Sequence, residues 1–180
     1  MKSISQIIGD YQGFFSDMLF HLDNLKINVK NFPLTHICYR VATFPEYESI
    51  REQIIPLGKS FSETIFNGRP ITLVILKQPL VFKEGFSVSL LELPAPKMSH
   101  RYPTGLEHAG FFVGETLPQF KRQYKTVLTG TKDRGKYSQP AFVTLKNGSV
   151  VKFYERTLLD VVNLQGVKFK SVKSYAKILS

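Results

Sequence analysis

The chain has 180 residues, of which 43% are hydrophobic and 21% charged, and its formal net charge is +10. This composition predicts one globular domain. The single cysteine excludes an internal disulfide, and no hydrophobic run approaches the roughly 18–20 residues that span a bilayer. Asp10 and Asp17 interrupt the N-terminal segment, so no secretory signal is expected. We therefore expect a cytoplasmic protein that is not associated with a membrane.

The N-terminal residues predict an amphipathic helix over residues 3–28. Ser3 and Gln6 have the spacing of a capping box. Hydrophobic residues then recur at helical spacing as far as Leu25. We expect this helix to pack against the rest of the domain and to carry His21 on its surface, without a catalytic role.

The next segment predicts the order strand, helix and three strands. This first module covers residues 33–96. Its expected strands lie at 35–43, 59–66, 71–76 and 86–93, and its helix at 45–57. Asn67-Gly68 is a hairpin signal between the second and third strands, and Gln78-Pro79 is expected to end the third strand.

A second module over residues 105–160 repeats this order in a shortened form. Its strands are expected at 107–113, 141–145 and 149–154, its helix near 117–128, and a reduced or lost strand within 129–139. A closing helix follows at 157–162. Together these elements predict a single domain over residues 1–165, followed by a weakly ordered basic tail at 166–180.

The positive charge gathers in the last third of the chain. Residues 1–120 hold 11 basic and 11 acidic residues, whereas residues 121–180 hold 13 basic and 3 acidic residues. Such an asymmetry is compatible with nucleic acid as a partner or with a solvated basic face. No motif of aromatic and basic residues for stacking bases accompanies the charges, so we favour the solvated face over a nucleic-acid partner.

A short pattern occurs in both modules. Residues 35–41 read THICYRV and residues 107–113 read EHAGFFV, so histidine and valine recur in register. Residues two apart in a strand share a face, so His36 and His108 each point away from their flanking hydrophobic neighbours. The pattern indicates a duplicated module whose halves deliver two imidazoles to a common cleft.

The last strands of the two modules contribute further polar residues. Aligning residues 87–92 with 149–154 makes Tyr154 the counterpart of Glu92, with Lys152 on the same face as Tyr154. A charged glutamate inside a hydrophobic strand is costly unless it is paired, hydrogen-bonded or bound to a metal.

Two neutral imidazoles and a carboxylate form a facial triad that holds a divalent transition metal and leaves positions open. His36, Glu92 and His108 are therefore the candidate metal ligands. In the alternative reading, both histidines are hydrogen-bonded core residues and Glu92 pairs with Arg40 or Arg69.

The duplicated modules, with histidine on the first strand, glutamate on the fourth and histidine on the fifth, resemble the vicinal oxygen chelate superfamily of glyoxalase-like and extradiol-dioxygenase-like proteins. The shorter motifs are similar to those of the YecM family. These motifs are THIxxR (35–40), NGRPI (67–71), LELP (91–94), RYP (101–103), EH (107–108) and VKF (151–153). The resemblance covers about residues 30–165. It implies an α+β fold in which two βαβββ-type modules form a cupped mixed sheet around a metal site, with an added N-terminal helix.

The sequence departs from the superfamily pattern on its last strand, which usually supplies a second carboxylate. Lys152 or Tyr154 occupies that region here, and YecM-like sequences tend to show histidine in place of Tyr154. Glu155 alternates to the other face. We assign Tyr154 and Lys152 as candidate catalytic groups that move a proton, with Tyr154 as an alternative weak ligand or supporting group.

Arg40, Arg69 and Tyr102 are the candidate substrate-binding residues. The planar fork of Arg40 suits a carboxylate, and its alternative role is a salt bridge at the rim. Structural roles are the alternatives for Arg69 and Tyr102, as they are for Arg101. Cys38 is expected to be a small buried filler and His100 a weak candidate.

Two functions follow from these assignments. The first is a metal-dependent protein, an enzyme of lyase, isomerase or dioxygenase type, that acts on or binds a small oxygen-bearing molecule through Zn, Fe, Mn or Ni. The second is a non-catalytic module that binds a small ligand through Arg40, Tyr102 and Lys152. Either form is expected to be a monomer or a homodimer.

Overall fold

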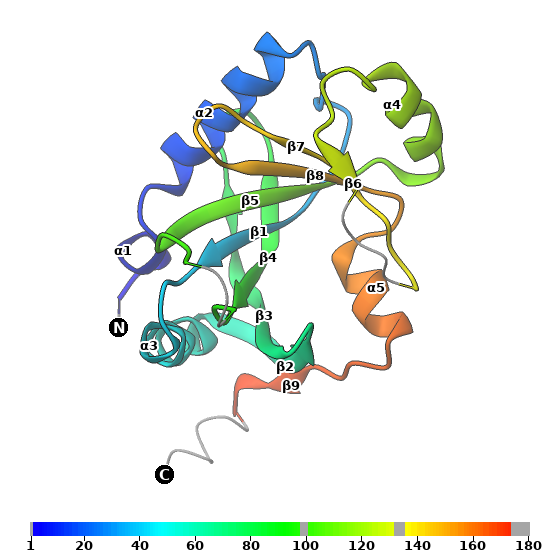
Figure 1. Ribbon diagram of the computed structural model, residues 1–180. Coiled ribbons are helices and arrows are strands. Elements are labelled where there is room, and N and C mark those ends of the chain that lie inside the picture. Colours follow the sequence, from blue (N-terminus) through cyan, green and yellow to red (C-terminus); the bar gives the residue numbers. More distant parts are fainter. Residues whose placement is uncertain (1, 98–100, 132–135, 174–180) are drawn as a thin grey trace.

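The computed structural model describes residues 2–97, 101–131 and 136–173 (Figure 1). Among these residues, nine strands form one mixed open sheet in the order β6-β7-β8-β5-β1-β4-β3-β2-β9. No helix in the described part of the chain is both long and apolar enough to cross a membrane.

The first module begins after two N-terminal helices, α1 (Ile4–Ile8) and α2 (Tyr11–Asn24). It consists of β1 (Leu34–Arg40), α3 (Phe44–Ile54), η1 (Ile55–Leu57), β2 (Gly58–Phe66), β3 (Arg69–Val81) and β4 (Ser87–Pro94). The second module consists of β5 (Gly105–Phe112), η2 (Gly114–Thr116), α4 (Leu117–Gln123), β6 (Gly130–Thr131), β7 (Ala141–Thr144) and β8 (Val150–Tyr154). It is followed by α5 (Leu158–Leu164) and β9 (Lys170–Ser171).

The first strands of the two modules lie side by side in the middle of the sheet. β1 and β5 pair in antiparallel orientation, β1 also pairs with β4 in parallel, and β5 pairs with β8 in parallel. The two modules therefore repeat one pairing scheme about a local twofold between β1 and β5. This topology confirms the predicted α+β fold of two βαβββ-type modules, in which the two-residue β6 is the shortened strand.

Several predicted boundaries differ from the structure: α4 ends at Gln123 rather than near residue 128, and the largest differences concern the N-terminal helix and β3. The helix predicted over residues 3–28 is divided, because Gly9 takes a positive φ of 82° and Asp10 begins α2 by accepting the backbone N–H of Gly13. β3 continues through Pro79 to Val81, with a register shift against β4 rather than the predicted stop. The irregular pairing tolerates proline, which has no N–H to donate.

The two faces of the sheet bury different sets of side chains. Leu91 and Leu93 of β4 join the main hydrophobic core, which also includes side chains of α1, α2, α3 and α4. Leu90 of β4 lies on the opposite face, in a smaller cluster with Leu73 of β3 and Val162 of α5. Because side chains alternate along a strand, Glu92 stands on the same face as Leu90.

The basic tail begins with residues that belong to the fold. Val167 and Phe169 pack against the smaller cluster, and Lys170 and Ser171 pair with Phe61 and Ser60 of β2. These apolar contacts and the β9 pairing place residues 167–171 against the sheet, within the tail that the sequence predicts to be weakly ordered. Residues 174–180 lie outside the described residues.

Candidate metal centre

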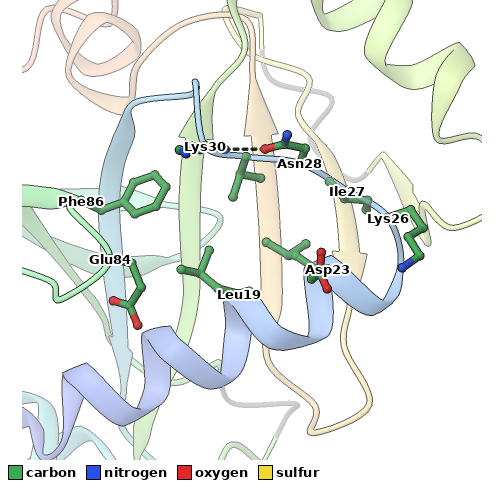
Figure 2. A pocket seen from close by; sticks show the side chains of 10 residues that line it. Leu19, Asp23, Lys26, Ile27, Asn28, Lys30, Glu84 and Phe86 are labelled. Carbon is green, nitrogen blue, oxygen red and sulfur yellow. Dashed lines mark hydrogen bonds between the residues drawn. The ribbon is translucent and has the colours of Figure 1, made fainter.

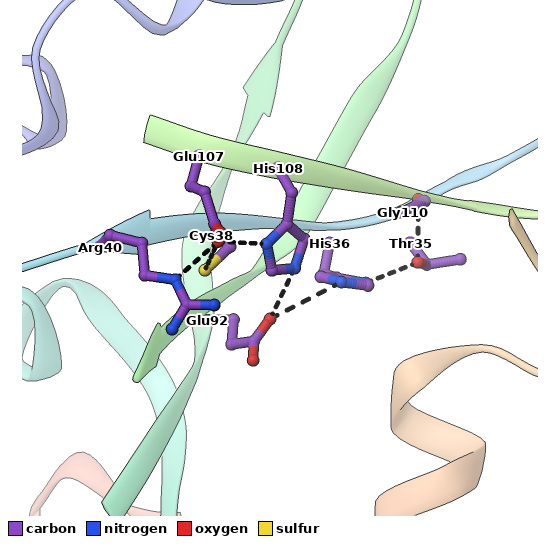
Figure 3. Close-up of polar contacts among 8 residues, drawn as sticks. All are labelled: Thr35, His36, Cys38, Arg40, Glu92, Glu107, His108 and Gly110. Atoms are coloured by element: carbon purple, nitrogen blue, oxygen red, sulfur yellow. Dashed lines mark hydrogen bonds and ion pairs between the residues drawn. The ribbon is translucent and has the colours of Figure 1, made fainter. Parts of the chain in front are cut away.

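The three side chains nominated as metal ligands come together on one face of the sheet (Figure 3). One ligand atom from each of His36, Glu92 and His108 lies within 4.8 Å of the others. Glu92 Oε2 is 3.0 Å from His108 Nε2 and 3.8 Å from His36 Nε2. The sheet register produces this approach, since Cys38 of β1 pairs with Glu92 on one side and His108 on the other.

A bulge before each histidine brings a supporting side chain onto the same face. The ladder between β1 and β5 shifts register twice, and the extra residue is Thr35 at one shift and Glu107 at the other. Bulges re-aim side chains that regular alternation would send to the opposite face. Thr35 Oγ1 thus lies 2.8 Å from His36 Nδ1, and Glu107 Oε2 lies 2.7 Å from His108 Nδ1.

These contacts fix the tautomers of both rings. The Thr35 hydroxyl donates a hydrogen bond to the Gly110 carbonyl oxygen at 3.0 Å, so it accepts a hydrogen bond from His36 Nδ1–H. The Glu107 carboxylate can only accept, and His108 Nδ1 donates to it. Although burial opposes ionisation, the contacts with His108 and Arg40 lower the pKa of Glu107 to about 2. When both rings are neutral, the Nε2 lone pair of each therefore faces the site.

Both Nε2 atoms are buried without a hydrogen-bond partner among the described residues. The His36 side chain is 0% exposed and the His108 side chain 1%. The 3.0 Å contact between His108 Nε2 and Glu92 Oε2 is an ion pair only when His108 is protonated. When both rings are neutral, three electron-pair donors face one another in this site, an arrangement that a cation would stabilise.

The protonation states match this picture. Burial lowers the pKa of His36 to about 3, with His108 and Lys152 adding to the effect and Glu92 opposing it. Burial alone would raise the pKa of Glu92, but the contact with His108 in its protonated form and the charge of Lys152 outweigh burial and hold that pKa below its usual range. At neutral pH the site therefore offers a neutral imidazole at His36 and an ionised carboxylate, which are the forms that bind metals.

Gly110 provides the space in which the His36 ring lies. It pairs with His36 across the ladder, and a Cβ at this position would overlap the His36 ring and come within 2.9 Å of Tyr154 Cε2. The Tyr154 ring packs against the other side of this space, with its centroid 5.4 Å from that of His36. A glycine is therefore required here by close approach of side chains rather than by backbone conformation.

The pairing of the last strands corrects the counterpart assigned to Glu92. Glu92 pairs with Cys38, two residues after His36, and Lys152 pairs with Gly110, two residues after His108. The module counterpart of Glu92 is therefore Lys152 and not Tyr154. The alignment of strand ends was wrong by two residues. Because a shift of two residues keeps each side chain on the same face of the strand, the hydrophobic alternation could not reveal the error.

Arg40 pairs with Glu107 rather than with Glu92. Its Nε donates to Glu107 Oε2 at 2.7 Å, and its guanidinium lies 4.7 Å from the centroid of the Tyr102 ring. Arg69 donates from Nη1 to the Ala95 carbonyl oxygen at 2.9 Å. The alternative pairing of Glu92 with Arg40 or Arg69 is thus not observed among the ion pairs of the described residues.

Glu107 is the site residue that the sequence did not reveal. Its oxygen contacts Arg40, His108 and, at 3.8 Å, the sulfur of Cys38. Burial, together with the charges of Glu92 and Glu107, raises the pKa of the buried Cys38 thiol. Strict alternation would place Glu107 on the face opposite His108, and only the bulge reverses this. The other weak candidate, His100, lies outside the described residues.

A separate hollow of about 460 Å³ lies between α2, the segment that follows it, and the turn before β4 (Figure 2). Leu19 and Phe86 contribute apolar walls, whereas Asp23 and Glu84 bring negative charge and Lys26 positive charge. None of its lining residues belongs to the triad. The hollow is therefore distinct from the candidate metal centre.

Comparison with known proteins assigns the chain to a family. A model of the YecM protein family matches residues 3–150. The chain belongs to the YecM family. A curated relative from Haemophilus influenzae, described as an uncharacterized protein, is 31% identical over 96 residues, covering 52% of this chain and 49% of that protein. The match thus spans about half the length of the relative.

Solved structures resemble this chain over most of its length. The structural-genomics protein EC4020 has a TM-score of 0.68 at 24% identity, covering 91% of this chain and 97% of that one, and shows the same fold. Protein BH1468 from Bacillus halodurans has a TM-score of 0.47 at 15% identity, covering 70% and 95%. A 2,2',3-trihydroxybiphenyl 1,2-dioxygenase from Sphingomonas wittichii has a TM-score of 0.40 at 16% identity, covering 67% and 41%.

Proposed function

We propose that His36, His108 and Glu92 bind one divalent transition-metal ion, Zn, Fe, Mn or Ni, and that the bound ion holds a small oxygen-bearing molecule. The observation that carries the proposal is the pair of buried Nε2 atoms, which lack hydrogen-bond partners among the described residues and face an ionised carboxylate. Each ring is held by its Nδ1 atom, so the electron pair on Nε2 is directed to the site.

The donor set fits such an ion. Two imidazoles and one carboxylate form the facial triad of many metal sites with open positions. Two ligand atoms about 2.1 Å from one metal lie about 3.0–3.4 Å apart. The 3.0 Å separation between Glu92 Oε2 and His108 Nε2 falls within this range, and the 3.8 Å separation to His36 Nε2 would have to shorten when an ion binds. Thr35 and Glu107 are the outer partners that orient the histidines, as supporting groups do in metal sites.

Lys152 and Tyr154 are the candidate residues for proton movement at the site. A divalent ion bound here supplies a Lewis acid that polarises the oxygens of its ligand. Lys152 contributes a positive charge that acts on both Glu92 and His36, and its amine is our candidate for moving a proton. Tyr154 is 5% exposed and rests against His36, so we assign its hydroxyl the secondary role in proton movement.

The metal content of the protein tests the proposal. Protein purified without a metal-affinity tag, or titrated with Zn²⁺ or Mn²⁺ after dialysis, is expected to hold one ion per chain. His21→Ala serves as the control, because His21 lies on α2 beside Asp17. A titration without saturable binding at one equivalent would reject the proposed metal site.

The lysine on β8 favours a second candidate function, a non-catalytic module that binds a small ligand. In this reading the positive charge of Lys152, at the position that matches Glu92, replaces a further metal ligand and attracts an anion. Ligand binding that is independent of metal would distinguish this module from the first candidate.

Lys152→Glu tests how close this position lies to the ion. The substitution replaces a repelling charge with a carboxylate at the module counterpart of Glu92, so it is expected to raise metal affinity at least tenfold, or about 1.4 kcal/mol. Lys152→Met removes only the repulsion and is expected to give a smaller rise. Competition with a chromogenic chelator measures both. If Lys152→Glu bound metal no more tightly than Lys152→Met, residue 152 would not lie close enough to the ion to bind it.

A further inference from the structure

Among the described residues, the buried guanidinium of Arg69 has no acidic partner, and it lies near the triad. Arg69 is 9% exposed, and its Nη1 donates to the Ala95 carbonyl oxygen. Its Nε is buried without a hydrogen-bond partner, and no carboxylate of the described residues pairs with it. A buried charge of this kind is costly unless a counterion accompanies it.

A second guanidinium nitrogen in the same region is also unsatisfied. Arg40 uses Nε to bind Glu107, and its Nη1 is buried without a hydrogen-bond partner among the described residues. Burial lowers the pKa of Arg69, and the charge of the nearby Arg40 adds to this effect. Two like charges held near each other at low exposure favour an anion between or beside them.

The sheet places both arginines on the face of the triad and at one end of it. Arg40 ends β1, which runs parallel to β4, and Arg69 begins β3, which runs antiparallel to β4. Leu73 of β3 pairs with Glu92, and alternation puts Arg69 on the same face. Figure 3 shows the Arg40 guanidinium on the side of the sheet that carries the Glu92 carboxylate.

The charges around the triad also favour an anion. Three cations, Arg40, Arg69 and Lys152, face two carboxylates, Glu92 and Glu107, which leaves a net charge of +1. A divalent ion would raise this to +3. An anionic ligand would restore much of the balance in a region with little access to water.

We propose that Arg69 and Arg40 form an anion subsite beside the metal triad, and that the ligand of this protein is a small carboxylate with a second oxygen on the neighbouring carbon, such as a 2-oxo or 2-hydroxy acid. The planar guanidinium matches a carboxylate, while the neighbouring oxygen is available to the ion. This inference rests on the proposed function and names the class of molecule that the site accepts.

Oxalate and catechol are the two probes that test the inference. Both present adjacent oxygens, but only oxalate carries carboxylates. Calorimetric titration of the Zn²⁺-loaded protein is expected to show oxalate binding that weakens at least tenfold in Arg69→Met and less in Arg69→Lys. The control is Arg51→Met, since Arg51 lies on α3 and pairs with Glu63. Unchanged oxalate affinity in Arg69→Met, or an equal loss for catechol, would overturn the anion subsite.

Two further measurements separate the possible failures. Zinc stoichiometry of each variant shows whether the triad and the fold are intact, and it is expected to stay at one ion per chain in Arg69→Lys and Arg69→Met. If Arg69→Met does not fold, the oxalate affinity of Arg69→Lys tests the subsite instead, because lysine keeps the positive charge but lacks the planar guanidinium. Thermal shifts of the metal-free protein with oxalate test the subsite without the ion. A shift that depends on Arg69 in a protein that binds no zinc would retain the subsite and reject the proposed metal function.

Discussion

Replacing His108 with alanine is expected to abolish stoichiometric metal binding. His108 Nε2 lies 3.0 Å from Glu92, so its removal takes away one of three donors and leaves the carboxylate without its nearest contact. His36→Ala and Glu92→Ala are expected to lower affinity by more than about 100-fold, beyond the 10–100-fold loss typical of residues that only orient a ligand. Metal content after dialysis and competition with a chelator measure these losses.

Controls distinguish the loss of a ligand from the loss of the fold. Glu92→Gln keeps the volume of the side chain while removing its charge, and it should also lose affinity. His21→Ala, a histidine on the surface of α2, should bind metal as the unmodified protein does. If His36→Ala, Glu92→Ala and His108→Ala all retained metal, the three residues would not be its ligands.

Hydrophobic periodicity and the repeated histidine were sufficient to predict the paired modules. The motifs at 35–41 and 107–113 fall on β1 and β5, the two strands that meet at the local twofold. Leu90 and Leu91 lie in different hydrophobic clusters, as alternation along a strand requires. These predictions succeeded because the burial of alternating side chains is a local property of each strand.

The errors concern properties that depend on the register between strands. The bulge that turns Glu107 toward His108 exists only in the pairing of β5 with β1, and nothing in the local sequence marks it. The match of Lys152 with Glu92 likewise comes from pairing with β5 and β1. Sequence alternation has a period of two and cannot distinguish registers that differ by two residues.

The role of Gly110 depends both on the local sequence of its strand and on the register between strands. Its place two residues after His108 is visible in the sequence, but its purpose appears only when His36 is seen to lie across it. In the other module the matching residue is Cys38, which is small and pairs with His108. Each module thus places a small residue beneath the imidazole that the other module supplies.

Gly110→Ala is expected to displace His36 and to destabilise the protein by about 1–3 kcal/mol, the usual cost of overpacking a core. The new methyl group would overlap the His36 ring and approach Tyr154 Cε2 to 2.9 Å. The same movement would take His36 Nε2 away from Glu92, so metal affinity should fall together with stability. Urea denaturation of the metal-free protein measures the free energy of unfolding, and chelator competition measures the affinity.

The double variant Gly110→Ala/His36→Ala shows whether the imidazole is the cause. In a protein that lacks this ring, the added methyl group has space, and only the Tyr154 contact remains. The cost of Gly110→Ala should therefore be smaller in the His36→Ala background, with an interaction energy of about 0.5–3 kcal/mol between the two sites. If Gly110→Ala cost the same free energy of unfolding in both backgrounds, glycine would be needed at this position for a reason other than the space that it leaves for the His36 ring. A smaller cost would mean that it serves the position of His36 and, through it, the geometry of the three donors.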